Sequence, residues 1–169
     1  MKPVAIIYTS NTGHTARYAA LLQEETSLPA YTLDEAKKEL KKGTPVIYLG
    51  WLFASTIKGY QKAAKQYTIC AVCGVGLCTT GALLEEVRKA AKIPENQPLF
   101  TVQGGMDYAK LRGLNKFMID ALIKGMSSKS QRTEGEEEML NLLRTGGDYV
   151  SREHLTDVLA WYNRISMTQ

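Results

Sequence analysis

The first 15 residues constrain the fold of this chain more than any other stretch. An apolar segment of strand length, residues 4–9, is followed directly by six small or polar residues: Ser10, Asn11, Thr12, Gly13, His14 and Thr15. Apolar residues then recur at helical spacing from Ala16 onward. This order predicts a strand, a tight loop and a helix N-terminus, where free backbone N–H groups and the helix dipole favour an anion. Because three of the six residues carry hydroxyls and Gly13 has no Cβ, we expect the loop to bind a phosphate group.

Two other phosphate-binding patterns are absent from the loop. It lacks the Lys of G-x-x-x-x-G-K-(S/T), and it lacks the G-x-G-x-x-G of dinucleotide-binding folds. It reads (S/T)-x-T-G-x-T, which resembles the phosphate loop of flavodoxins. That resemblance implies that residues 10–15 hold the terminal phosphate of FMN. The alternative is an ordinary helix N-cap formed by Ser10 or Thr12. His14 could donate to the phosphate or be an exposed loop residue.

Apolar segments alternate with amphipathic segments along the first two thirds of the chain. Strands are expected at residues 4–9, 30–33, 45–50, 68–75 and 98–103, and helices at residues 16–25, 34–42, 57–67 and 81–92, the second of them capped by Asp34. Such alternation predicts a parallel sheet with helices on both faces. Together with the phosphate loop it indicates one α/β domain over residues 1–169. We expect a flavodoxin-like, doubly wound five-stranded sheet of order 2-1-3-4-5, with its switch point between the first and third strands.

The loops expected after the third and fourth strands are unusually apolar. The first contains Trp51, Leu52, Phe53 and Ala54, and the second contains Val75, Gly76, Leu77 and Cys78. The resemblance to flavodoxins implies that these loops flank the isoalloxazine ring of FMN. Trp51 or Phe53 would then lie against the ring, because a flat π-system needs planar apolar walls. Alternatively, these two aromatic side chains fold back into the core.

The three cysteines suggest neither a disulfide framework nor a metal site. Cys70 and Cys73 fall in an apolar segment and are expected to be small buried residues, because a zinc site would need two further ligands nearby. Cys78 lies in an expected loop, where it could be exposed. An odd number of cysteines fits a reducing cytoplasm. No Ser–His–Asp arrangement is recognisable, so we expect no catalytic side chain.

The last third of the chain extends the resemblance. Residues 114–126 have an apolar face at helical spacing, formed by Leu114, Phe117, Met118, Ala121, Leu122 and Met126. An acidic stretch at residues 134–138 and a closing helix at 151–165, capped by Ser151, follow. With a helical insertion at 104–150 after the fifth strand, the chain is similar to the menaquinone-dependent protoporphyrinogen oxidase family, on the residues Gly104, Gly105, Tyr108, Phe117, Met118 and Ile119.

This second resemblance implies an FMN-dependent oxidoreductase that passes electrons from a porphyrinogen to a quinone. The alternative function is a non-enzymatic electron carrier that serves a redox partner protein. In both cases the flavin would supply the chemistry, and protein groups would position and tune it.

The charge of the chain bears on its partners. The net charge is +4 with a pI near 8.9, and residues 110–132 carry six of the 21 Lys and Arg residues against Asp120 alone. A basic amphipathic helix could contact an anionic membrane, an acidic partner or a propionate-bearing substrate. The alternative is a helix packed on the core with a solvated basic face. No aromatic and basic face for nucleic acid is recognisable. The absence of a long apolar run and of a signal peptide predicts a cytoplasmic protein, with peripheral membrane contact through residues 110–132 as one option.

Overall fold

A central sheet of parallel strands organises the computed structural model, which describes residues 1–167. Its strands are β1 (Ala5–Thr9), β2 (Ala30–Thr32), β3 (Pro45–Phe53), β5 (Thr68–Gly76) and β6 (Leu99–Gln103). They lie side by side in the order β2-β1-β3-β5-β6, and every neighbouring pair is parallel. A short strand, β4 (Thr56–Ile57), pairs antiparallel with the end of β3. The predicted α/β class with a mostly parallel sheet is therefore confirmed.

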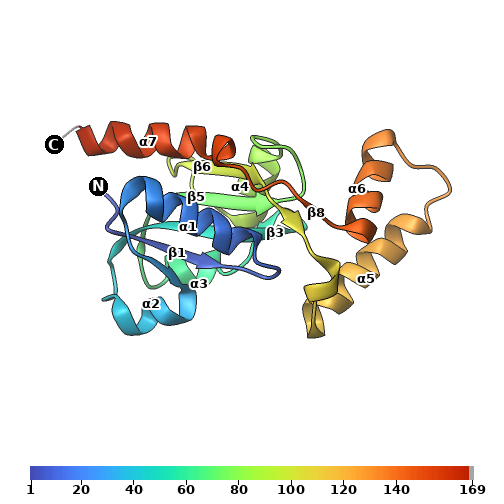
Figure 1. Cartoon of the computed structure of the whole chain (residues 1–169), viewed down its shortest axis with the longest axis horizontal. Coiled ribbons are helices and arrows are strands. Elements are labelled where there is room, and N and C mark those ends of the chain that lie inside the picture. Colours follow the sequence, from blue (N-terminus) through green and yellow to red (C-terminus); the bar gives the residue numbers. More distant parts are fainter. Residues whose placement is uncertain (168–169) are drawn as a thin grey trace.

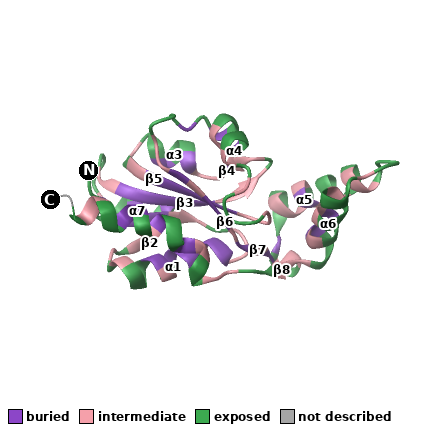
Figure 2. Cartoon of the chain, turned by 90° about the horizontal axis from the view of Figure 1, so that it is seen from above, coloured by how far each residue is buried: buried purple, intermediate pink, exposed green. Residues whose placement is uncertain are grey.

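Helices cover both faces of this sheet (Figure 1). On one face lie α1 (His14–Thr26) and α7 (Thr156–Met167), and on the other lie α2 (Leu33–Glu39), α3 (Tyr60–Ala64) and α4 (Leu84–Ala91). Successive residues of a strand point to opposite faces, so Ala5 and Ile7 pack on the side of α2 to α4, whereas Ile6 packs on the side of α1. The buried residues accordingly follow the strands through the middle of the molecule (Figure 2).

Several element boundaries differ from those expected. α2 is capped by Thr32, not by Asp34, because Thr32 and Glu35 form a reciprocal capping box. The helix expected at residues 57–67 shortens to α3, because Thr56 and Ile57 pair with Phe53 and Leu52 and extend β3 past its expected end. α1 begins two residues earlier than expected, because His14 and Thr15, which were assigned to the loop of residues 10–15, belong to the first turn of the helix.

A helical hairpin leaves the sheet after β6 and returns before α7. It comprises α5 (Gly113–Ser127) and α6 (Glu134–Thr145), and it is joined to the sheet by a two-stranded antiparallel ladder of β7 (Gly105–Met106) and β8 (Gly147–Asp148). A 3₁₀ helix, η1 (Tyr108–Lys110), precedes α5, and another, η2 (Arg152–Leu155), precedes α7. Ser151 accepts a hydrogen bond from the N–H of Glu153 and so caps η2, whereas the closing helix that it was expected to cap begins only at Thr156. The hairpin projects from the end of the sheet that is opposite the C-terminus (Figure 1).

Only part of the apolar face expected for residues 114–126 is buried. Leu114 and Phe117 are exposed, whereas Ile119 is buried and packs with Met106, Leu111 and Leu143. The helix has apolar residues around more than half of its circumference, so their spacing alone does not select the inner face. Within residues 1–167, every helix is too short or too polar to span a bilayer.

Candidate functional site

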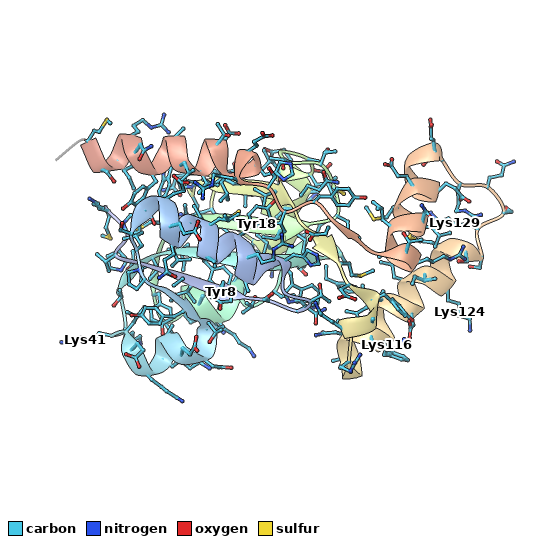
Figure 3. The ribbon with its side chains drawn as sticks, viewed as in Figure 1. Tyr8, Tyr18, Lys41, Lys116, Lys124 and Lys129 are labelled. Atoms are coloured by element: carbon cyan, nitrogen blue, oxygen red, sulfur yellow. The ribbon has the colours of Figure 1, made fainter. Side chains whose placement is uncertain are left out.

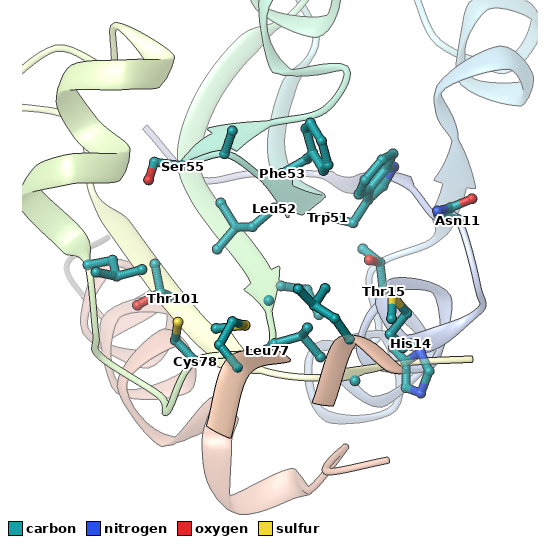
Figure 4. Close-up of a pocket in the computed structure, with 18 of the residues that line it drawn as sticks. Asn11, His14, Thr15, Trp51, Leu52, Phe53, Ser55, Leu77, Cys78 and Thr101 are labelled. Atoms are coloured by element: carbon teal, nitrogen blue, oxygen red, sulfur yellow. The ribbon is translucent and has the colours of Figure 1, made fainter. Parts of the chain in front are cut away.

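A cavity of about 270 Å³ lies at the carboxyl ends of β1, β3 and β5, beneath the helical hairpin. Parallel α/β sheets bind ligands at this edge. The cavity brings together all of the residues predicted for the site except Gly13, which faces a neighbouring polar groove beside Arg17 and Asp148. Figure 4 shows Thr15 and His14 at one end of the cavity, Trp51 and Phe53 along one side, and Cys78 and Thr101 at the other end.

The loop of residues 10–13 is closed by its own side chains. Ser10 Oγ accepts hydrogen bonds from the backbone N–H groups of Gly13 (3.2 Å) and Ala16 (3.4 Å). Gly13 takes φ +103°, a conformation that L side chains rarely adopt, and the helix begins at the next residue. Ser10 therefore braces the first turn of α1, but the N-cap residue is Gly13, neither Ser10 nor Thr12 as the capping alternative expected. The first-turn amides of His14 and Thr15 still have no intrahelical acceptor.

Thr15 is the polar residue best placed to receive a ligand. It is only 2% exposed, it lines the cavity, and its hydroxyl has no hydrogen-bond partner in the part of the chain that the structure describes. The Thr15 oxygen is not among the fully buried, unpartnered side-chain polar atoms of the described residues, so it is accessible from the cavity. The end of the cavity beside α1 therefore offers a free donor at a helix N-terminus.

His14 is buried, so the alternative of an exposed loop histidine is wrong. Its Nδ1 lies 3.1 Å from Thr12 Oγ1, and its Nε2 lies 3.9 Å from a carboxylate oxygen of Asp148. Burial lowers the pKa of His14 below its usual value, and the opposing effect of Asp148 is smaller. At neutral pH the ring is neutral, so the pair of Thr12 and His14 contributes hydrogen bonds to this end of the cavity without a fixed charge.

Trp51 and Phe53 form one wall of the cavity. Both lie on β3, two residues apart and so on the same face of the strand, and both are half-buried. Their rings meet edge to face with centroids 6.2 Å apart, and Lys58 Nζ lies 5.5 Å from the centroid of Trp51 and 5.1 Å from that of Phe53. Neither ring folds back into the sheet core, although Phe53 also packs on the apolar cluster of the hairpin.

The helical hairpin supplies a second apolar wall, which the sequence did not reveal. Its contributions are Met106, Ile119, Leu122, Met126, Met139 and Leu143. Asn115 of α5 donates a hydrogen bond to Asn11 Oδ1 (3.0 Å), which ties the hairpin to the loop before α1. Ala82, Leu83 and Thr101 complete the far end of the cavity. Among residues 1–167 no Asp, Glu, Lys or Arg lines the cavity, so it suits a largely apolar ligand with one polar or anionic end.

The cysteines are free thiols. Cys73 is buried as predicted, and burial raises its pKa to about 12, whereas Cys70 is half-exposed rather than buried. Cys78 lines the cavity, and burial raises the pKa of its thiol as well. A protonated thiol is a weak nucleophile. In the described residues no group of three or more His, Cys, Asp or Glu side chains is arranged to hold a metal ion.

Comparison of the chain with protein-family models, with curated proteins and with solved structures finds no match.

Proposed function

We propose that this protein binds FMN non-covalently in the cavity and transfers electrons through the flavin, as a flavodoxin-like protein. The observation that carries the proposal is the polarity of the cavity. One end is a helix N-terminus with the unpartnered hydroxyl of Thr15, and the remaining walls are mostly apolar, with Ser55, Thr79 and Thr101 among them. FMN has the matching distribution, because a phosphate group terminates a chain attached to a flat, largely apolar ring.

The arrangement of the sheet supports this proposal. The cavity lies where the connections from β1 and β3 leave in opposite directions, which is the switch point of a doubly wound sheet. The loop after β1 has the (S/T)-x-T-G-x-T pattern, and α1 begins directly behind it. The phosphate loop and the cavity thus meet at the place where the flavodoxin-like arrangement would bind its cofactor.

The residues present fit FMN. Thr12, Thr15 and the first-turn amides of α1 would hold the phosphate, since Thr12 and Thr15 line the cavity where the helix begins. Trp51, Phe53 and the segment from Val75 to Cys78 would enclose the ring. The bound flavin would supply one- or two-electron chemistry. The chain's own residues would bind and orient it and keep water out, and we assign no catalytic side chain.

The hairpin supports a proposal for the electron partner. Its Leu, Ile and Met side chains extend the cavity as an apolar wall, which supports an oxidoreductase that acts on an apolar partner such as a quinone or a porphyrinogen. The alternative is a non-enzymatic carrier that passes electrons to a redox partner protein. Reoxidation of the reduced holoprotein by a soluble quinone distinguishes them. An oxidoreductase gives saturable kinetics that Met139→Lys abolishes, and a carrier gives slow, non-saturable kinetics that this variant leaves unchanged.

The visible absorption spectrum tests the proposal. After FMN is added and the excess removed by gel filtration, we expect a flavin spectrum that elutes with the protein. A colourless protein after the same treatment would contradict FMN binding.

A further inference from the structure

The outer face of α5 is apolar and exposed. Leu114 and Phe117 are 72% and 69% exposed, and Met118, Ala121 and Leu122 lie on the same side at spacings of three and four residues. At about 100° per residue the apolar sector from Phe117 round to Ile119 covers roughly 200°. A surface helix needs about half of that to bury one face. The inner half of the sector covers the cavity and α6, which leaves the outer half without a role in folding.

The charges around this face are positive. The sole carboxylate of α5, Asp120, lies beyond the apolar sector and is paired with Lys116 (3.1 Å). Lys129 and Arg132 are likewise paired with Glu136 and Glu137, and Lys110 with Asp107, so the basic excess of residues 110–132 is smaller than the sequence indicated. Of the six basic residues in 110–132, Arg112 and Lys124 are exposed and make no ion pair with the described residues, and they lie near the two ends of α5. The remaining glutamates of the hairpin, Glu134 and Glu138, are on α6.

We propose that the outer face of α5 docks on an anionic membrane surface, with Leu114 and Phe117 inserted at the level of the headgroups. The hairpin forms the end of the molecule that is farthest from the C-terminus, so a planar surface can reach it without meeting the sheet domain (Figure 1). Apolar side chains that protrude from a helix and are flanked by Lys and Arg match an anionic interface. A second copy of the chain is a poorer occupant, because antiparallel pairing of two α5 helices brings Arg112 of one copy toward Lys124 of the other.

Docking in this orientation would bring the membrane close to the cavity. Leu122 is 40% exposed on the outer face and lines the cavity as well, so the two apolar surfaces meet at this residue. An apolar molecule dissolved in the bilayer could reach the cavity along them. The docking itself does not depend on FMN binding, and its test gives the same answer for the apoprotein.

Co-sedimentation with lipid vesicles tests this surface. The full chain is expected to bind vesicles of phosphatidylcholine with phosphatidylglycerol at least about tenfold more strongly than vesicles of phosphatidylcholine alone, and the binding should fall as salt is raised. The double variant Leu114→Ser with Phe117→Ser should reduce binding by about tenfold or more. Both residues are exposed, so its circular dichroism and unfolding midpoint should equal those of the wild type.

Two matched variants control for composition and charge. Val4→Ser removes an apolar side chain that is 51% exposed near the N-terminus, and it should not change vesicle binding. Lys124→Glu should weaken binding about tenfold. Lys41→Glu makes the same change of charge at the opposite end of the molecule (Figure 3) and should have less than about a twofold effect. Absent binding to anionic vesicles, or equal losses in the α5 variants and their controls, would overturn the proposal. A wild-type dimer that dissociates on Phe117→Ser would also overturn it, because this face of α5 would then bind a second copy of the chain.

Discussion

Replacing Thr15 with valine should weaken FMN binding about tenfold or more and leave the stability of the protein unchanged. The hydroxyl of Thr15 has no partner in the described residues, so the folded protein loses no hydrogen bond when it is removed. Val keeps the shape of the side chain and has a similar helix propensity. A bound phosphate would lose one hydrogen bond from a buried donor, and bonds to charged groups contribute about 1.5–3 kcal/mol. Fluorescence titration with FMN and a thermal melt of the apoprotein measure the two effects.

Thr101→Val is the matched control, because Thr101 lines the same cavity at its other end. Its hydroxyl donates to the carbonyl oxygen of Ala82 (2.8 Å), and the variant leaves that carbonyl without this partner. We expect a loss of about 1–3 kcal/mol in the free energy of unfolding and a smaller change in FMN affinity than Thr15→Val produces. If Thr15→Val binds FMN as the wild type does, Thr15 does not contact the phosphate.

Replacing Gly105 with alanine should lower the free energy of unfolding by about 3 kcal/mol. Gly105 begins the ladder that joins the hairpin to the sheet, and it has φ +152°. A Cβ at this position would lie 2.1 Å from the carbonyl oxygen of Gly147 and 2.8 Å from His14 Nε2. The strand β8 and the ring of His14 must both move, so FMN affinity should fall as well. Urea denaturation measures the loss of stability.

Gly125→Ala controls for the substitution itself. Gly125 lies inside α5 with no atom within 4 Å of the position of a Cβ, so alanine should raise the free energy of unfolding by up to about 1 kcal/mol. A Gly105→Ala variant as stable as the wild type would show that β7 and β8 do not hold the hairpin as the structure describes.

The first strand, the loop after it, the helix α1 and the sheet could be predicted because their signals are local. Residues 10–15 are consecutive, and both the strand before them and the helix after them have clear apolar periodicity. Strands buried on both faces are continuous apolar segments, and their alternation with helices determines the parallel architecture. The loops after β3 and β5 could be placed beside the phosphate loop for the same reason, since parallel strands end at one edge of the sheet.

The second apolar wall of the cavity could not be predicted, because it depends on how the hairpin packs against the end of the sheet. Ile119, Met126 and Met139 reach the cavity only through the packing of α5 on α6 and through contacts such as that of Asn115 with Asn11. The extension of β3 to Phe53 likewise requires its pairing with β4, which is a tertiary interaction.

The helix α6 and the inner face of α5 could not be identified from the sequence, for different reasons. The helix α6 was missed because its first residues are acidic, although Thr133 and Glu136 have the spacing of a capping box and do form one. Which side of α5 faces inward could not be identified because apolar residues occupy most of its circumference. A helix that buries one face and exposes another apolar face cannot be oriented by periodicity alone.

Calorimetric titration of the apoprotein with FMN and with riboflavin tests whether the loop before α1 binds a phosphate. The two ligands share the ring and differ in the phosphate that the loop before α1 is proposed to hold. We expect FMN to bind at least about a hundredfold more tightly than riboflavin, since several hydrogen bonds to a charged group are lost without the phosphate. Equal affinities would show that the loop does not hold a phosphate and would contradict the account.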